Sequence, residues 1–216
     1  MTRRLYFIGA FVVLLIGFLL LAYQPWSPSW AIRREASHCF GSILLRSVEI
    51  HPIKNDFPKP GPLSRHEFFV VSIPPRKDGC TVVYYAGQAS ALPYNFNKAI
   101  VQDNLRVSGP QTVLAVAGTY ISVVSGQAII LNSKEDIPRF LDGVNRVDGA
   151  NHGRSYNGVI APPAITAVNG GYKIEATSWS KFFGSIVHWK LTMDTNGRIL
   201  ESHSVVLATL VGPYTF

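Results

Sequence analysis

The feature that most constrains this chain is an apolar run close to its N-terminus. Residues Leu5 to Ala22 (LYFIGAFVVLLIGFLLLA) carry no charge, and Tyr6 is their only strong hydrogen-bonding side chain. A helix that crosses a bilayer needs about 20 apolar residues, with a range of roughly 17–25. We therefore expect a transmembrane anchor over residues 5–23, preceded by a cytoplasmic tail of residues 1–4.

The residues after the run are typical of a membrane–water interface. Tyr23, Trp26 and Trp30 are amphipathic aromatic side chains of the kind that favour the headgroup zone. Pro25 and Pro28 end or kink the helix. These residues predict contact with membrane lipid at the end of the anchor.

A cleavable secretory signal peptide is the alternative to an anchor, with Ser29-Trp30-Ala31 as its cleavage site. Signal peptides have shorter apolar regions of about 7–15 residues, which favours the uncleaved anchor. The arginine pairs Arg3-Arg4 and Arg33-Arg34 flank the run almost symmetrically, so charge alone does not orient it. The short tail and the paired cysteines favour a cytoplasmic N-terminus and a periplasmic (extracytoplasmic) main domain. We expect the anchor to lie in a cell membrane, and a bacterial inner membrane fits best.

Composition excludes several classes of protein. The chain has 216 residues and a net charge of +7, with 47% hydrophobic and only 15% charged side chains. Such a chain is not intrinsically disordered, and its length suits one domain with an appendage. No more than two Lys or Arg residues are adjacent, so the basic stripe of a nucleic-acid-binding protein is lacking. We expect a mild attraction to an anionic membrane or cell wall.

Cys39 and Cys80 are the only cysteines. An even pair in an exported domain predicts one disulfide, which closes a loop of about 40 residues. The alternative is a nucleophilic thiol at Cys80, because Asp78-Gly79-Cys80-Thr81 resembles the cysteine motif of cell-wall transpeptidases. The string lacks the preceding histidine of that motif.

The predicted organisation is a stalk over residues 24–64 and one β-rich α+β domain, mainly antiparallel, over residues 65–216. Residues 51–64 contain four prolines and predict an extended connector, whereas residues 31–46 suit either a helix capped by Ser29 or the start of a strand. Strands are predicted at 67–73, 81–86, 112–117, 120–124 and 127–131. Helices are predicted at 97–107 and after an N-cap at Ser133 with an acidic N3 residue, Asp136.

The C-terminal region predicts a long hairpin around Asn196-Gly197, the strongest signal for a type I′ turn. If these two residues form the loop, the numbers of paired residues sum to 393. Strict alternation then gives one packed and one solvated face. The apolar face holds Val187, Trp189, Leu191, Met193, Leu200 and Val206, and the polar face holds His188, Lys190, Thr192, Asp194, Glu201 and His203.

Two groups of residues are candidate contacts for a partner or ligand. On the polar hairpin face, His188, His203 and Glu201 are close enough for an acid–base or metal site, although ordinary cross-strand pairs have the same pattern. In the Gly-rich stretch 142–158, oxygen and nitrogen side chains recur at Asp142, Asn145, Asp148, Asn151 and His152. This stretch suits a plain loop, a partner contact or a calcium site. We expect neither a metal nor a cofactor.

No catalytic set is convincing. Ser178-Trp179-Ser180-Lys181 matches Ser-x-x-Lys, but its companion motifs are missing. We therefore expect a non-catalytic subunit or scaffold of a larger membrane or cell-envelope complex, which binds other envelope proteins. The apolar ending, residues 212–216, also suggests a partner. In outline, this arrangement resembles periplasmic scaffold components of secretion systems. The alternative is an anchored envelope enzyme, or a binder of small ligands or cell wall.

Overall fold

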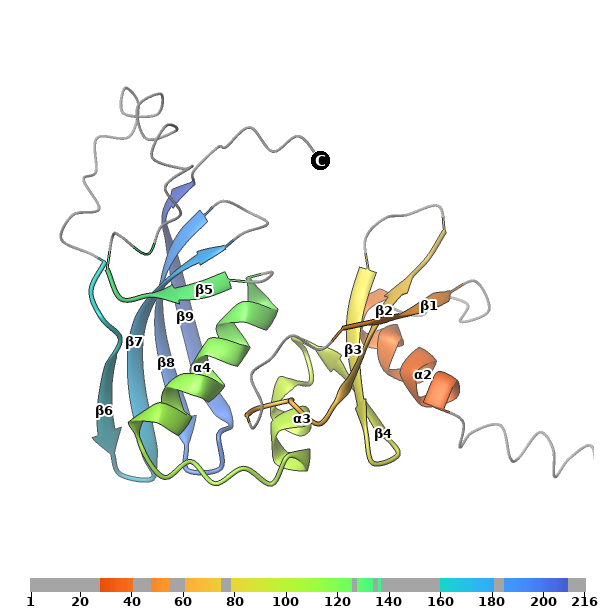
Figure 1. Cartoon of the computed structure of the whole chain (residues 1–216), viewed down its shortest axis with the longest axis horizontal. Helices are drawn as coiled ribbons and strands as arrows, with labels where there is room; N and C mark the ends of the chain where they lie inside the picture. The colour runs from red at the N-terminus through yellow and green to blue at the C-terminus, as the bar shows by residue number, and fades with distance from the viewer. Residues whose placement is uncertain are drawn as a thin grey trace, which may run out of the picture. The chain divides into compact units, whose positions relative to one another are not determined.

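The chain forms a β-rich α+β fold with two antiparallel sheets, as the sequence predicts (Figure 1). The computed structural model describes residues 28–40, 48–54, 61–74, 79–125, 128–133, 136, 160–180 and 185–209. None of the helices in these ranges is long and apolar enough to cross a membrane. The apolar run and the predicted anchor lie outside the described residues.

The chain divides into two compact units, whereas the sequence led us to expect a single domain after a stalk. Unit 1 comprises Met1–Asn55 and His66–Tyr94, and unit 2 comprises Asp56–Arg65 and Asn95–Phe216. Each unit has its own sheet. The Pro-rich stretch therefore contributes to both units.

Unit 1 is a four-stranded sheet with one helix packed on it (Figure 1). Its elements are α2 (Pro28–Phe40), β1 (Glu49–Ile53), β2 (Glu67–Ser72), β3 (Gly79–Tyr85) and β4 (Gln88–Leu92), with strand order β1-β2-β3-β4. Ile32 and Ala36 of α2 are buried against Val71, Val82 and Ala91 of the sheet. The helix and the first strand, which the sequence analysis places in a stalk, thus contribute to a core.

Two local features of the sequence fit the strand arrangement of unit 1. Pro52 lies within β1, which is tolerated because β1 is an edge strand. The turn between β3 and β4 consists of Ala86 and Gly87, both with positive φ, as a type I′ turn requires. The sequence analysis predicts neither this turn nor β4, because Gln88–Leu92 (QASAL) lacks the β-branched and aromatic residues typical of strands.

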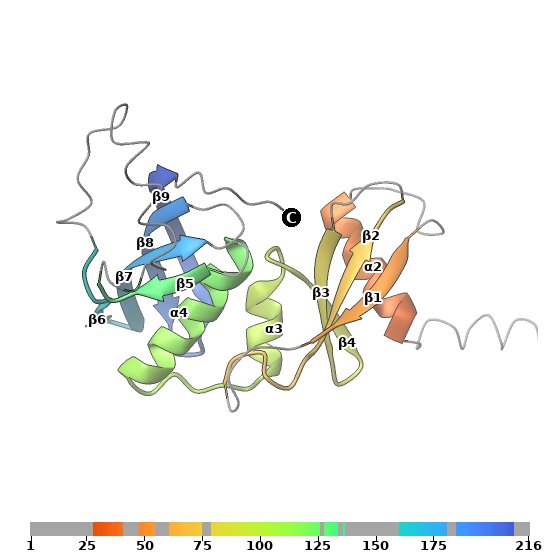
Figure 2. The same cartoon turned by 45° about the horizontal axis from the view of Figure 1, so that its top comes forward.

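Unit 2 combines two helices with a five-stranded sheet (Figure 2). Its elements are α3 (Phe96–Gln102), α4 (Pro110–Val124), β5 (Ala128–Leu131), β6 (Ala164–Val168), β7 (Gly171–Ser180), β8 (Ser185–Asp194) and β9 (Ile199–Thr209). The order is β5-β7-β8-β9, and β6 pairs with the first half of β7 while β5 pairs with its end. Helix α4 packs against β5 and β7.

The two strands predicted at 112–117 and 120–124 are wrong, because these residues form one helix, α4. Pro110 stands at the start of the helix, where proline is best tolerated. The buried positions Val113, Val116, Ala117 and Ile121 recur with helical spacing. Gly118, taken as a turn residue in the sequence, lies where an added Cβ would stand 3.4 Å from Ile130 of β5. Tertiary packing therefore overrides the local β preference.

The predicted hairpin of β8 and β9 is present with the predicted register over most of its length. His188 pairs with Val205, Lys190 with His203 and Thr192 with Glu201, so each pair sums to 393. The apolar face is buried at Val187, Trp189, Leu191 and Met193.

The predicted turn type is wrong. Gly197 has a φ of +82°, but Asn196 is not among the positive-φ residues, so this is not a type I′ turn. Instead, the Asp194 carboxylate accepts hydrogen bonds from the backbone N–H groups of Asn196 (2.8 Å) and Arg198 (2.9 Å). This side-chain support stabilises a longer loop, closed by the Asp194 N–H, which donates to the Arg198 carbonyl.

The longer loop shifts the strand by one residue, and a bulge restores the register. Met193 pairs with Ile199, whereas Thr192 pairs with Glu201, so Leu200 is the extra residue. Leu200, predicted on the packed face, is consequently 60% exposed, and Ile199 is buried in its place.

Candidate functional site

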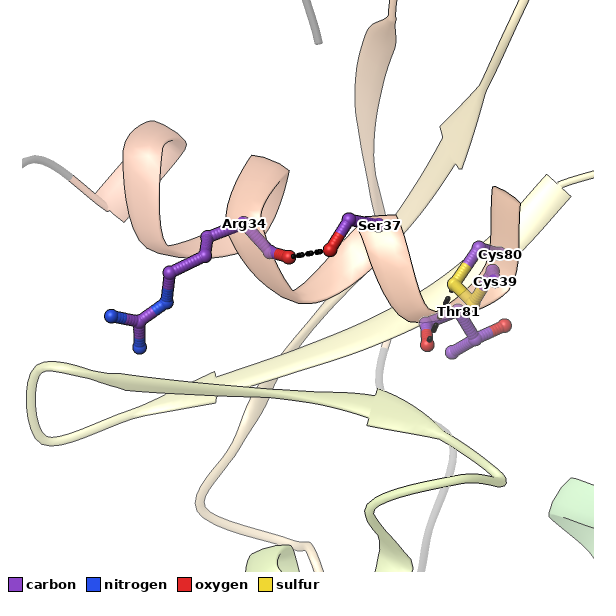
Figure 3. The surroundings of a disulfide bond; sticks show 5 residues. All are labelled: Arg34, Ser37, Cys39, Cys80 and Thr81. Atoms are coloured by element: carbon purple, nitrogen blue, oxygen red, sulfur yellow. Dashed lines mark hydrogen bonds between the residues drawn. A yellow bond between two sulfur atoms is a disulfide. The ribbon is translucent and has the colours of Figure 1, made fainter. Parts of the chain in front are cut away.

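The predicted disulfide between Cys39 and Cys80 is confirmed, and it joins α2 to β3 within unit 1 (Figure 3). The Cα atoms are 5.9 Å apart, and the sequence separation of the cysteines is 41. The alternative of a nucleophilic thiol at Cys80 is therefore wrong, because its sulfur is already bonded and the residue is buried.

The serines of the Ser-x-x-Lys string have structural partners. Ser178 Oγ accepts a hydrogen bond from the indole N–H of Trp189 (2.9 Å), and Ser180 Oγ donates to the carbonyl of Ser125 (2.5 Å). Both serines are completely buried. They hold β7 to β8 and to the end of α4, and Lys181 lies outside the described residues.

The sheet of unit 2 has one face of polar side chains, which we call the polar sheet face. It consists of Lys173, Glu175, Thr177, His188, Lys190, Thr192, Glu201 and His203. Strands β7, β8 and β9 arrange these residues in cross-strand rows: Thr177–His188, Glu175–Lys190–His203 and Lys173–Thr192–Glu201. In these rows Lys190 lies opposite Glu175, whereas Lys173 and Glu201 each lie opposite Thr192.

The contacts on the polar sheet face are those of paired side chains on a solvated sheet. Lys190 Nζ lies 3.3 Å from Glu175 Oε1, with both side chains more than half exposed. Thr192 Oγ1 donates to Glu201 Oε2 at 3.4 Å. Exposed ion pairs of this kind contribute about 0–1 kcal/mol.

His188 and His203 are diagonal neighbours on this face, as the hairpin predicts. His188 is half-buried, and its Nδ1 lies 3.5 Å from Thr177 Oγ1. Among the described residues, no group of three or more His, Cys, Asp or Glu side chains could hold a metal ion. The metal alternative for His188, His203 and Glu201 therefore finds no support among the described residues, and the acid–base alternative stays a prediction.

Strand β9 stands at one end of the strand order of the unit 2 sheet. Within the described part of the chain it pairs only with β8, which makes it an edge strand of 11 residues. Val205 and Val206 are each 61% exposed and point to opposite faces of the sheet. We call strand β9 with its exposed aliphatic side chains Leu200, Val205 and Val206 the β9 edge.

Two parts of this surface are not predicted from the sequence. Glu175, the partner of Lys190, was missed because β7 was not predicted. The β9 edge was missed because the alternation was extended through Val206, although the adjacent pair Val205-Val206 interrupts it. That interruption is the signal by which the apolar edge could have been found.

The remaining candidate contacts lie outside the described residues. These are Asp142, Asn145, Asp148, Asn151 and His152 of the Gly-rich stretch, and the interface residues Tyr23 and Trp26. Trp30, the third predicted interface residue, lies on α2 and is 40% exposed.

No family model matches this chain, and no significant match was found among curated proteins or solved structures.

Proposed function

We propose that the chain is a non-catalytic, membrane-anchored subunit of a larger membrane or cell-envelope complex, and that it binds a protein partner along the β9 edge. The anchor rests on the apolar run of residues 5–22 in the sequence. In this proposal the N-terminus is cytoplasmic and both units are periplasmic.

The observation that carries the binding role is the β9 edge, which within the described residues pairs on one side only and exposes aliphatic side chains. An edge strand presents unpaired N–H and C=O groups, and native proteins usually protect such edges with short length, charge, proline or a covering element. Described residues 199–207 have one charged residue, Glu201, and expose three aliphatic side chains, at Leu200, Val205 and Val206. An extended partner segment that adds a strand would pair the backbone groups and cover the valines.

The first experiment identifies the proteins that bind to this chain. We would extract the tagged native protein in mild detergent, separate the extract by size and identify co-eluting proteins by mass spectrometry. A discrete assembly with stoichiometric partners supports the proposal. A lone protein of about 24 kDa contradicts it.

The second experiment locates the contact. The double variant Val205→Lys and Val206→Lys puts two charges on the β9 edge, which should block strand addition and release the partner. Val168→Lys is the matched control, because Val168 is an exposed residue of β6 in the same sheet. Circular dichroism checks folding of both variants. Retention of the partner by the Val205/Val206 variant would exclude this edge as the contact.

The alternative, an envelope enzyme or small-ligand binder, is tested on the polar sheet face. His188→Ala with His203→Ala should leave complex formation and function unchanged if the protein is a non-catalytic subunit. Loss of function in a folded, correctly assembled double variant would favour the alternative instead.

A further inference from the structure

Helix α2 has two chemically distinct sides. The side toward the sheet is buried at Ala31, Ile32, Glu35 and Ala36. Its other side presents Ser29, Trp30, Arg33, Arg34, Ser37 and His38, all exposed or half-buried. The spacing of these positions places them on one face of a helix. We call this the outer face of α2.

The outer face combines an aromatic ring with positive charge. Trp30 is 40% exposed, and the guanidinium carbon of Arg34 lies 5.0 Å from the centre of its ring (cation–π). Arg33 adds a second guanidinium. Glu35 is the only acidic residue of α2; it is 5% exposed on the inner side, with its Oε1 atom 3.9 Å from Arg34 Nη2. The outer face therefore carries the guanidinium groups of Arg33 and Arg34, and the one carboxylate of α2, Glu35, lies on its inner side.

Figure 3 shows how this helix is held. The disulfide fixes its C-terminal end to β3, and Ser37 Oγ donates to the Arg34 carbonyl at 2.6 Å. The Arg34 side chain extends away from the disulfide along the helix (Figure 3). Unit 1 thus presents the outer face on a folded support rather than on a loose peptide.

The position of α2 in the chain brings this face near a membrane. Only residues 23–27 separate Ala22, the end of the apolar run, from Pro28, the start of α2. Fully extended, this connection spans at most about 20 Å. The outer face is therefore tethered within reach of the headgroups if the run crosses the bilayer.

We propose that the outer face of α2 docks onto anionic phospholipid headgroups, with Arg33 and Arg34 close to phosphate groups and Trp30 at the headgroup level. Basic residues next to an anchor attract acidic lipids, and tryptophan favours this zone. The docking orients unit 1 with α2 toward the membrane and its sheet away from it. This inference rests on the membrane anchor of the proposed function.

The test uses the full chain in vesicles that contain brominated phosphatidylcholine, which quenches nearby tryptophan. Quenching is compared between a Trp26→Phe variant and the Trp26→Phe, Trp30→Phe double variant, because their difference isolates Trp30. Vesicles are made with and without phosphatidylglycerol. We expect Trp30 to be quenched more strongly when phosphatidylglycerol is present, and the increase to shrink at high salt because ions screen the charges.

Charge-neutral variants provide the decisive comparison. Each basic residue near an anionic surface contributes roughly a fivefold preference, so Arg33→Gln with Arg34→Gln should lower the docked-to-undocked ratio about 30-fold. Glutamine preserves helix propensity. The matched control, Arg106→Gln with Arg198→Gln, removes two exposed arginines from unit 2 and should leave Trp30 quenching unchanged.

The outcomes separate this inference from the proposed function. In one outcome the chain stays in the vesicles after carbonate washing, but Trp30 quenching changes neither with phosphatidylglycerol nor with the Arg33/Arg34 substitutions. This outcome contradicts the docking and leaves the anchor in place. A chain that carbonate removes from the vesicles overturns the anchor and the docking together.

Discussion

At the scale of single residues, side-chain hydrogen bonds to backbone N–H groups decide the local geometry of this chain. Asp194 supports the hairpin loop in this way, and Asp136 does the same before the predicted helix. Asp136 Oδ2 accepts hydrogen bonds from the N–H groups of Asn132 (2.6 Å) and Ser133 (3.1 Å). The bond to Ser133 has the direction of the N3-to-N-cap bond of a capping box. The helix predicted after Ser133 lies outside the described residues.

The first prediction concerns the pH dependence of this contact. The backbone hydrogen bonds from Asn132 and then Ser133 lower the pKa of Asp136 below its ordinary value of 3.8. A carboxyl with a lowered folded-state pKa stabilises the fold above its unfolded-state pKa, and this contribution disappears as the pH falls through the folded-state pKa. We expect the amide signals of Asn132 and Ser133 in NMR spectra to shift with a midpoint below 3.8. Asp136→Asn should abolish the shift, and a midpoint at or above 3.8 would contradict the role of these hydrogen bonds.

At the scale of elements, period and flanking residues predict those strands that are rich in β-branched and aromatic residues. The strands expected at 67–73, 81–86 and 127–131 correspond to β2, β3 and β5. Strand β4 was missed because its residues are small, and α4 was misread because Val113, Ile121 and their neighbours have a β preference. Burial against β5 and β7 determines α4, and that partner surface is not visible in the local sequence.

The second prediction concerns the hairpin loop. Gly197 has positive φ, and an added Cβ would lie 3.1 Å from Ile100 and 3.3 Å from Val107. Gly197→Ala should therefore destabilise the protein by about 1–2 kcal/mol for the backbone, with a further cost for the crowded packing. The measurement is urea denaturation followed by circular dichroism.

Gly170 offers a matched control for this loop. It has a φ of +81°, but an added Cβ would meet nothing within 4 Å. Gly170→Ala should show the backbone cost alone. Equal losses of stability in the two variants would show that the packing of Gly197 against Ile100 and Val107 contributes nothing.

At the scale of the whole molecule, two separate segments of the chain belong to unit 2, Asp56–Arg65 and Asn95–Phe216. In the described part of the first segment, residues 61–65, Leu63 and Arg65 contact the buried Asp103. Asp103 Oδ2 accepts a hydrogen bond from the Leu63 N–H at 2.6 Å, and its backbone carbonyl accepts one from the Arg65 guanidinium. The Pro-rich stretch was predicted as an extended connector. The residue that Leu63 contacts, Asp103, lies 40 residues further along the chain, so local sequence does not reveal the contact. Its role depends on a long-range contact.

The third prediction uses the location of the disulfide. The bond between Cys39 and Cys80 lies within unit 1. A disulfide that closes a loop of this length stabilises the folded state by about 3–4 kcal/mol. Cys39→Ala with Cys80→Ala should accelerate hydrogen exchange in β2 and β3 while leaving β7 and β8 unchanged. Equal acceleration in both sheets would instead show that the two units unfold as one cooperative body.

The sequence by itself determined the features whose causes are local or covalent. These are the apolar run, the pairing of the two cysteines, and the alternation that defines the two faces of β8 with the register of its hairpin. Tertiary structure alone decided the division into two units and the helical state of α4. The physical reason is that burial depends on which surfaces meet. Residues 112–124 have a local preference for strand, yet they form a helix because β5 and β7 offer a surface that an apolar helix can cover.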